Sequence, residues 1–215
     1  MTHSAMPDDN LAESTEKVAA VVAAAGRSTR MGEPKQLLPW GKRTVLGSVA
    51  SHLAEAGASP VLCVVGHRAA EMAAALGDAP AQLIDNPDYL QGEMLSSYQA
   101  GVRHLLAETT PYLGTLLALG DQPHIPVDVI RRVIAQARCS PFQIVIPSYN
   151  MRRGHPFYLP AHLWPELLSL SHDDTLRTRV QRHQASITYV EVDTDSILRD
   201  IDTPADYQAL AAKEM

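Results

Sequence analysis

Short apolar runs alternate with segments of helical periodicity, and this alternation limits the fold more than any other feature of the chain. The runs have the length of buried strands, and the segments between them place apolar residues three or four positions apart. Such alternation predicts an α/β fold whose parallel-rich sheet is covered by helices on both faces. In these sheets, ligands bind beyond the carboxyl ends of the strands. The expected strands are Val18–Ala24, Val61–Val65, Gln82–Asp85, Tyr112–Leu119 and Gln143–Ile146.

Several of the expected helices have recognisable ends. Thr44 is placed to cap a helix that Gly57 terminates, and Pro126 begins another. A further helix is expected to start at Ser96 and Ser97, because Asn-Pro and a glycine before them mark a loop. The other expected helices are Ala69–Leu76, Leu163–Leu168, Thr175–His183 and one capped by Thr203 with Pro204 at its first position.

The ends of the chain and its second half are less regular. Residues 1–16 are polar, acidic and without periodicity, which predicts a disordered tail. Ser148–Leu159 is interpreted as a turn or hairpin, and Ile187–Val192 as a strand. No internal repeat and no linker-like stretch divides the rest, so residues 17–215 are expected to form a single domain.

Charge and cysteine content exclude several classes of protein. The 215 residues carry a formal net charge of −6, which argues against a nucleic-acid-binding protein. Cys63 and Cys139 lie far apart, as expected for reduced thiols in a cytoplasmic protein. No apolar run reaches membrane-spanning length. The run after Lys17 imitates a signal peptide, but an acidic segment precedes it, so that interpretation is rejected.

The stretch Val22–Pro39, VAAAGRSTRMGEPKQLLP, is the strongest chemical signal in the chain. Small residues follow the first expected strand and let a ligand approach the backbone, and Arg27, Arg30 and Lys35 then supply positive charge. This combination predicts a phosphate-binding loop. It is not a Walker A loop, because Glu-Pro follows Gly32 where Lys-Ser/Thr is needed. It also lacks the three closely spaced glycines of a dinucleotide fingerprint.

The same stretch resembles the signature of nucleotidyltransferases that use a nucleoside triphosphate, and within them the MobA-like branch. The leading leucine of that signature is replaced by Ala23. The resemblance implies a Rossmann-like, three-layer α/β/α nucleotidyltransferase fold with a mixed, mostly parallel sheet. It also implies catalytic roles for Arg30, Lys35 and Asp121. The matching residues are Ala24, Ala25, Gly26, Ser28, Arg30, Met31, Gly32, Lys35, Leu37, Leu38 and Pro39.

Two acidic motifs are predicted to hold a magnesium ion. Asp121 follows an apolar strand and Gly120, so it projects from a rigid edge, and Asp202 comes from a turn near the carboxyl terminus. Magnesium is usually held by one or two carboxylates together with phosphate oxygens. The motifs GDQP and DIDTP resemble the two acidic motifs of the family. Asp200 is an alternative second ligand, and either aspartate has a structural alternative as a helix cap or helix-dipole partner.

The base of the nucleotide is expected to lie against Ala24, Ala25 and Gly26. On its other side, Gly92 and Ser97 match loop positions that read the pyrimidine edge in related cytidylyltransferases. The Ala-Ala-Gly form of the signature resembles the cytidylyl-transferring branch, since guanylyl-transferring relatives carry Ala-Gly-Gly. The resemblance therefore favours CTP. For Ser97, ordinary helix capping is the alternative.

The acceptor side is predicted from Arg153, Gly154, His155 and Pro156, which resemble an Arg-Gly-His-Pro motif of the molybdenum cofactor cytidylyltransferase group. Arg153, His155 and Gln122 are the predicted acceptor contacts. The resemblance implies a molybdopterin-type acceptor and, as partner, a molybdoenzyme or its chaperone. Three alternatives remain: transfer to a sugar phosphate or other small phosphorylated acceptor, a non-catalytic nucleotide- or cofactor-binding protein of the same fold, and a dinucleotide-dependent oxidoreductase.

Overall fold

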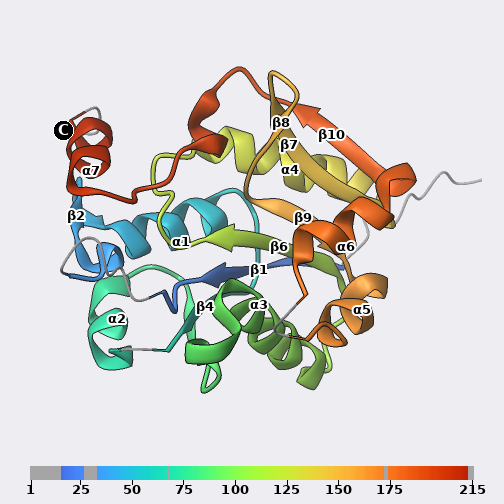
Figure 1. Cartoon of the computed structure of the whole chain (residues 1–215), viewed down its shortest axis with the longest axis horizontal. Coiled ribbons are helices and arrows are strands. Elements are labelled where there is room, and N and C mark those ends of the chain that lie inside the picture. Colours follow the sequence, from blue (N-terminus) through green and yellow to red (C-terminus); the bar gives the residue numbers. More distant parts are fainter. Residues whose placement is uncertain (1–15, 27–32, 67, 172–173, 213–215) are drawn as a thin grey trace, which may run out of the picture.

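A twisted sheet forms the centre of the computed structural model, with helices on both of its faces (Figure 1). The structure describes residues 16–26, 33–66, 68–171 and 174–212, without the side chains of residues 91–93. The strands of the main sheet are β1 (Lys17–Ala23), β4 (Val61–Val65), β5 (Gln82–Asp85), β6 (Tyr112–Leu119), β7 (Ile144–Tyr149), β8 (Arg152–Arg153), β9 (Phe157–Pro160) and β10 (Ile187–Glu191). This arrangement confirms the predicted α/β class.

The strand order is β10-β7-β9-β6-β1-β4-β5, and β8 pairs with the end of β7. Strand β1 lies between β4 and β6 and runs parallel to both. Strand β9 is antiparallel to β6 and β7, so the sheet is mixed but mostly parallel, as predicted. The register pairs Ala23 with Leu119, which places the carboxyl ends of β1 and β6 side by side at one edge.

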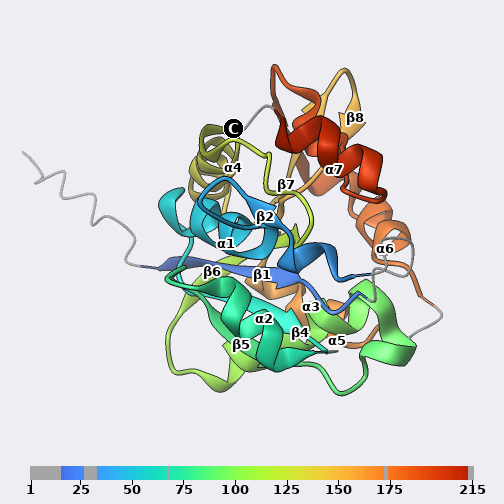
Figure 2. The same cartoon turned by 90° about the vertical axis from the view of Figure 1, so that its left-hand side faces the viewer.

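Two apolar clusters hold the helices against the sheet. On one face, α1 and α4 pack with Val18, Ala20 and Val22 of β1. On the other face, α3, α5 and α6 pack with Ala19 and Val21. Strand residues alternate between the two faces, so one apolar strand contributes to both cores. Figure 2 shows the resulting layers edge-on. The helices are α1 (Val45–Glu55), α2 (Ala69–Leu76), α3 (Tyr89–Ala107), α4 (Val127–Cys139), α5 (Trp164–Leu168), α6 (Leu176–Arg182) and α7 (Pro204–Ala211).

Most expected elements are confirmed, and their ends explain why. Thr44 accepts a hydrogen bond from Gly47 N at the start of α1, and Pro126 precedes α4. Thr203 and Asp206 form a capping box at the start of α7, with Pro204 at its first position. The expected hairpin after β7 is present, since Ser148 pairs with Arg153.

The prediction of a loop over Asn86–Ser97 was wrong. Helix α3 begins at Tyr89, two turns before the expected start, so Ser97 lies inside the helix and does not cap it. Leu90 and Met94 in the first turns are exposed, whereas Tyr98, Val102 and Leu105 are buried. The apolar stripe therefore begins later than the helix, and the sequence pattern shows only its second half.

A small unit not expected from the sequence ties the carboxyl terminus to the phosphate-binding stretch. Strands β2 (Pro39–Trp40) and β3 (Arg43–Thr44) form a two-stranded sheet of their own. Trp40 packs there with Ile201 and Leu210, and Tyr207 donates a hydrogen bond to the carbonyl of Pro39 at 2.6 Å. This unit fixes the loop before α7, which contains Asp200 and Asp202.

Two expectations about the class of protein can be compared with the described residues. None of the helices in this part of the chain is long and apolar enough to cross a membrane. Cys63 is buried, Cys139 is exposed, and both are free thiols.

Candidate active site

The carboxyl ends of β1 and β6 approach closely enough to bring the small-residue turn beside Asp121. Gly120 N donates to the carbonyl of Ala23 at 3.0 Å. A Cβ at Gly120 would lie only 3.0 Å from that oxygen and from Ala24 Cβ, so a larger residue would force the strand ends apart. Ala24 and Ala25 are almost fully buried, and Gly26 is exposed. Asp121 therefore projects from a rigid edge, as its position after Gly120 predicts.

Lys35 lies between the two predicted metal carboxylates. Its Nζ forms an ion pair with Asp121 Oδ2 and a second one with Asp202 Oδ1 at 3.1 Å. Lys35 lies in a short 3₁₀ turn, Lys35–Leu37, whereas Asp202 is 167 positions away in the sequence. The fold thus brings together three residues that the sequence analysis selected from three separate motifs.

The charge of Lys35 is stabilised by this arrangement. Burial lowers the pKa of Lys35, but the charges of Asp121 and Asp202 and the hydrogen bonds to them outweigh burial, and the pKa is raised above its ordinary value. Lys35 is therefore a fixed ammonium at neutral pH, set beside the small-residue turn of the phosphate-binding stretch.

Asp200 and Asp202 have different partners although they are two positions apart. Ile201 between them is fully buried against Trp40, and the carboxylates on either side of it reach the site. Gln122 Nε2 donates to Asp200 Oδ1 at 2.9 Å and to the carbonyl of Arg199 at 3.0 Å. Burial, and then the charges of Asp121 and Asp202, raise the pKa of Asp200 above its ordinary value. The site thus contains three neighbouring carboxylates.

The carboxylates of Asp121 and Asp202 suit a hard divalent cation. Asp121 Oδ1 is buried and has no hydrogen-bond partner in the part of the chain that the structure describes. Its other oxygen already lies against a cation, the ammonium of Lys35. No group of three or more His, Cys, Asp or Glu side chains is arranged for a metal among the described residues. Two oxygen ligands completed by substrate phosphates match the way magnesium is usually held.

Strand direction brings the predicted acceptor residues to the same edge. Because β9 is antiparallel, its first residue, Phe157, pairs with Leu117 near the end of β6. His155, two residues earlier, therefore lies at the edge where Asp121 is found. Gly154 is required there, since a Cβ would lie 2.3 Å from the carbonyl oxygen of Ile197. These contacts fix the start of β9.

Arg153 and His155 present different chemistry at this edge. Arg153 is exposed, and its guanidinium lies over the Tyr189 ring, 5.2 Å from the ring centroid. The His155 ring packs against Phe157 with centroids 5.6 Å apart. Burial lowers the pKa of His155 to about 4, so the imidazole is neutral at pH 7. His155 can donate one hydrogen bond to an acceptor substrate but carries no positive charge. Arg153 can donate hydrogen bonds and also carries a positive charge.

The neutral His155 predicts a pH-dependent difference in stability. The folded protein binds the proton only near pH 4, but the unfolded chain binds it near pH 6.5, so acidification favours unfolding between these values. We expect His155→Gln to remove this contribution, which has a slope of about 1.4 kcal/mol per pH unit. Urea denaturation at pH 7 and pH 5 measures it. The wild type should lose more stability than the variant, and equal losses would contradict the buried neutral imidazole.

The residues predicted to bind the base are only partly brought together. Ser97 is fully buried, and Asn86 Nδ2 lies 3.4 Å from its hydroxyl oxygen and 2.9 Å from that of Ser96. Gly92 falls within α3 rather than in a loop, in the stretch whose side chains are not described. Arg30 lies outside the described residues. The geometry therefore supports the triphosphate end of the site more directly than its base end.

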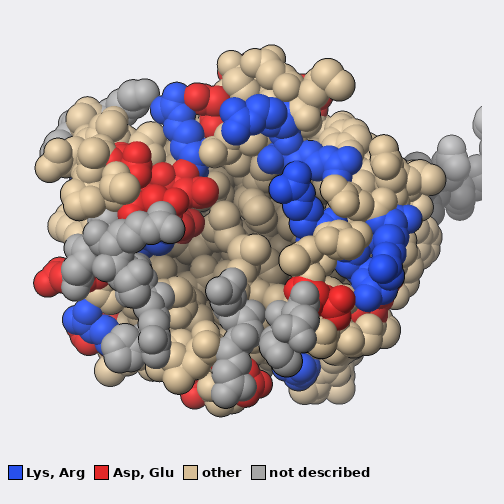
Figure 3. All heavy atoms as spheres, in the orientation of Figure 1, with Lys and Arg blue, Asp and Glu red and all other residues tan. Residues whose placement is uncertain are grey.

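A hollow in the molecular surface lies over this edge of the sheet. Figure 3 shows acidic side chains on one side of the hollow, over the loop before α7. Lys and Arg side chains follow its upper and right borders, over β8 and α6. Arg152 and Arg153 on β8 and Arg177 and Arg182 on α6 are exposed. The basic side chains along its border therefore suit a polyanionic ligand.

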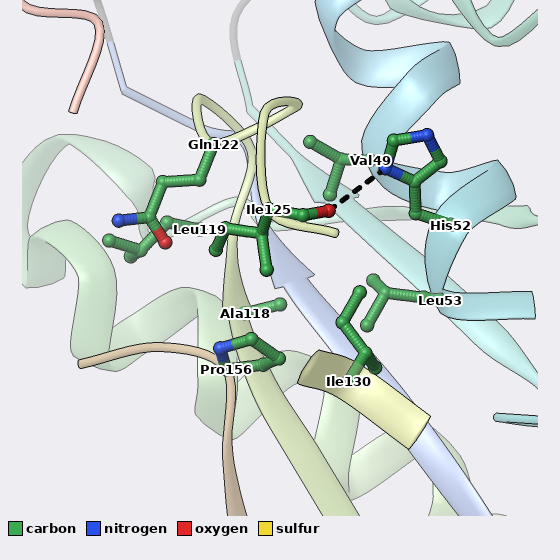
Figure 4. A pocket seen from close by; sticks show the side chains of 9 residues that line it. All are labelled: Val49, His52, Leu53, Ala118, Leu119, Gln122, Ile125, Ile130 and Pro156. Carbon is green, nitrogen blue, oxygen red and sulfur yellow. Dashed lines mark hydrogen bonds between the residues drawn. The ribbon is translucent and has the colours of Figure 1, made fainter. Parts of the chain in front are cut away.

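A separate small pocket lies behind the Asp121 loop (Figure 4). Its cavity of about 10 Å³ holds no more than about one water molecule, so it cannot accept a nucleotide. His52 Nδ1 lies 3.2 Å from the carbonyl oxygen of Ile125 beside it, which ties the loop to α1. The pocket is lined by Val49, His52, Leu53, Ala118, Leu119, Gln122, Ile125, Ile130 and Pro156.

The sequence analysis missed two residues that shape the site and gave a third, Gln122, a different role. Gln122 was predicted to contact an acceptor, but it is only 5% exposed and its amide nitrogen is engaged, so the geometry supports a link between loops instead. Trp40 and Tyr98 were not singled out. Trp40 packs beneath Ile201, and Tyr98 is fully buried with its hydroxyl 3.3 Å from the carbonyl of Ala118. A lone aromatic residue in an apolar segment carries no signal of such a role.

Known proteins resemble this chain along most of its length. Nicotine blue oxidoreductase of Paenarthrobacter nicotinovorans is 31% identical over 195 residues, covering 86% of this chain and 92% of that protein. Molybdenum cofactor cytidylyltransferase of Escherichia coli (strain K12) is 28% identical over 195 residues, covering 90% of this chain and 94% of that protein. The crystal structure of Rv0371c from Mycobacterium tuberculosis H37Rv in complex with manganese superposes with a TM-score of 0.73 at 29% identity. The match covers 91% of this chain and 98% of that one.

These similarities agree with the geometry of the site. The predicted nucleotidyltransferase fold is confirmed, and a protein of the same fold and similar sequence binds a divalent metal. The family model of the MobA-like NTP transferase domain matches residues 20–187, which include Lys35, Asp121 and the Arg153–Pro156 motif. The chain therefore belongs to the family of MobA-like NTP transferases.

Proposed function

We propose that this protein is a magnesium-dependent cytidylyltransferase that moves CMP from CTP to the phosphate of a molybdopterin-type acceptor and releases pyrophosphate. The observation that carries the proposal is the placement of Lys35 between Asp121 and Asp202, beside the Ala24–Gly26 turn. The similarity to the Escherichia coli cytidylyltransferase supports the choice of acceptor. We also propose that residues 17–215 act as one nucleotidyltransferase domain.

The reaction needs one bond formed and one broken at the α-phosphorus. An oxygen of the acceptor phosphate attacks this phosphorus, and the bond to the bridging oxygen of the β-phosphate breaks, so pyrophosphate leaves with the electron pair. Lys35 supplies a fixed positive charge where the phosphate charge develops. Arg30, from the same stretch, is proposed to bind the triphosphate beside it. A magnesium ion held by Asp121 and Asp202 would neutralise phosphate charge and orient the triphosphate.

The acceptor is proposed to lie on the opposite border of the hollow. Arg153 is exposed there with its guanidinium held over Tyr189, so it can pair with an acceptor phosphate without first being ordered. His155 lies at the same edge as a neutral hydrogen-bond donor. A molybdoenzyme or its chaperone, as recipient of the product, is the proposed protein partner.

Nucleotide choice provides a test of the base site. Ala25 is 7% exposed, and its methyl group is expected to narrow the slot for the base and so to favour a pyrimidine over a purine. A buried base edge left unpaired costs about 1–3 kcal/mol. We therefore expect CTP to exceed GTP by at least about tenfold in kcat/KM, and Ala25→Gly to narrow the gap without reversing it. Steady-state kinetics with both triphosphates and one acceptor measure this. A preference for GTP would show that the base is selected elsewhere.

The identity of the nucleotide and of the acceptor is tested by combining each candidate nucleotide with each candidate acceptor. The protein is incubated with magnesium and each of CTP, GTP, ATP and UTP, with and without molybdopterin or a sugar phosphate, and pyrophosphate release is followed. The proposal expects release that requires both CTP and molybdopterin. Release with a sugar phosphate instead would favour the alternative acceptor, and no release with any pair would contradict nucleotidyl transfer.

A second candidate function is an oxidoreductase activity. The observation that favours it is the 31% identity to nicotine blue oxidoreductase over 86% of the chain. The phosphate-binding stretch lacks the glycine spacing of a dinucleotide fingerprint, which counts against it. Oxidation of NADH or NADPH in the presence of a quinoid dye separates the two candidates, because nucleotidyl transfer consumes neither.

A further inference from the structure

The two acidic loops of the site are joined by a link other than Lys35. The Gln122 amide nitrogen bridges 78 positions of sequence to reach Asp200 Oδ1, and it also donates to the carbonyl of Arg199. The link therefore holds both the backbone and a side chain of the loop before α7. Figure 4 shows the amide of Gln122 on the side away from His52 and the apolar pocket. Gln122 thus reaches toward the acidic loop rather than into the core.

Stability alone does not explain a glutamine at this position. Its side chain is 5% exposed, and its Oε1 is buried without a hydrogen-bond partner among the described residues. A buried amide oxygen without a partner destabilises the folded state. Methionine has a similar shape and would bury no such oxygen. The feature of glutamine that the structure uses is the pair of N–H donors directed at the acidic loop.

The link separates the roles of two neighbouring carboxylates. Asp202 Oδ1 faces Lys35, whereas Asp200 Oδ1 faces Gln122. Without the Gln122 donors, the two carboxylates would stand near Asp121, where Lys35 pairs with Asp121 and Asp202 but Asp200 would lose its hydrogen bond from the amide. Like charges that lie this close repel one another, so the loop would be expected to move outward. The amide is neutral, and it engages Asp200 without competing with a metal for charge.

We propose that Gln122 is a positioning residue that holds Asp200 aside and sets the distance between Asp121 and Asp202, so that Asp202 shares the divalent metal with Asp121. Asp200 is then an anchor rather than a metal ligand. This inference rests on the proposed function for its purpose. Its direct consequence is a metal affinity, which can be measured without turnover.

The first test compares two glutamines that each donate to a side chain. In Gln122→Met the shape is kept and the donors are lost. Gln136→Met is the matched control, because Gln136 Nε2 donates to Ser140 Oγ at 3.1 Å on α4, away from the site. Mn²⁺ is titrated with CTP present and no acceptor, and free Mn²⁺ is read by electron paramagnetic resonance. We expect Gln122→Met to weaken Mn²⁺ binding by about tenfold or more and Gln136→Met by less than about twofold.

The second test compares the two aspartates. Asparagine at position 200 keeps an oxygen that accepts from Gln122, so Asp200→Asn should weaken Mn²⁺ binding by less than about threefold. Asp202→Asn removes the charge that faces the metal and should weaken it by about tenfold or more. Equal effects, or the reverse order, would overturn the assignment. This comparison also decides the proposal if Gln122→Met does not fold.

These outcomes separate the positioning role from the proposed function. If no acceptor receives a nucleotide but Mn²⁺ binding follows the expected order, nucleotidyl transfer is wrong and the positioning role stands. If transfer occurs and Gln122→Met binds Mn²⁺ as the wild type does, the positioning role is wrong and the proposed function stands. Thermal melting of each variant shows whether a loss of binding reflects unfolding.

Discussion

Replacing Lys35 by alanine is expected to lower turnover by roughly a hundredfold or more while the fold persists. The ammonium of Lys35 is half-buried, pairs with Asp121 and Asp202, and remains charged at neutral pH. A charge fixed in this way stabilises the transition state without reorganisation, so its loss should reduce kcat more than it raises KM. Pyrophosphate release under saturating CTP, combined with circular dichroism, measures the effect.

A nearby lysine provides the control for this change. Lys42 lies in the turn between β2 and β3 and is exposed, so Lys42→Ala should leave turnover within about twofold of the wild type. Lys35→Arg keeps the charge but changes its shape, and it should recover part of the activity. A well-folded Lys35→Ala protein that releases pyrophosphate at the wild-type rate would remove Lys35 from the mechanism.

Replacing Asp121 by asparagine is expected to have an effect of similar size. The change keeps the shape of the side chain but removes its charge, and the buried Oδ1 atom has no hydrogen-bond partner among the described residues. We expect turnover to fall by roughly a hundredfold and the magnesium concentration for half-maximal activity to rise. A magnesium titration of wild type and variant at fixed CTP gives both quantities.

The control for Asp121 is an exposed carboxylate that has an arginine partner. Asp128 pairs with Arg131 on the exposed face of α4, so Asp128→Asn should leave the magnesium titration unchanged. Superimposable titration curves for Asp121→Asn and the wild type would return Asp121 to a structural role.

The parts of the fold that sequence predicts are those whose pattern is local. The strands Val61–Val65 and Tyr112–Leu119 were predicted with their observed bounds, because a buried strand reads as a nearly continuous apolar run. The helix starts at Thr44 and Thr203 follow from capping chemistry between residues three positions apart. Such features depend on nothing distant in the chain.

The direction of a strand and the start of a helix whose first turns are exposed cannot be predicted from a local pattern. Strand β9 runs antiparallel, which its apolar residues cannot indicate because alternation is the same in both directions. Helix α3 begins at Tyr89 with exposed side chains at Leu90 and Met94, so its first turns lack the inward-facing stripe from which a helix is predicted.

In the candidate site too, the sequence predicts individual residues but not the contacts between them. Motifs selected Lys35, Asp121 and Asp202 one by one, but only the fold reveals that one ammonium contacts both carboxylates. The role of Gln122 could not be predicted, because its partner Asp200 lies in another motif. Motif spacing along the chain therefore predicts which residue types take part in the chemistry. Which of these residues contact one another depends on the sheet topology.

The most direct test of nucleotidyl transfer follows the nucleotide itself in a single turnover. CTP labelled at the α-phosphate is mixed with excess protein, magnesium and molybdopterin, and both products are quantified after rapid quenching. Transfer predicts that the label appears in the acceptor in a one-to-one ratio with pyrophosphate, and that Lys35→Ala slows both together. Label that remains in CTP, or that appears as free CMP with no labelled acceptor, would contradict it.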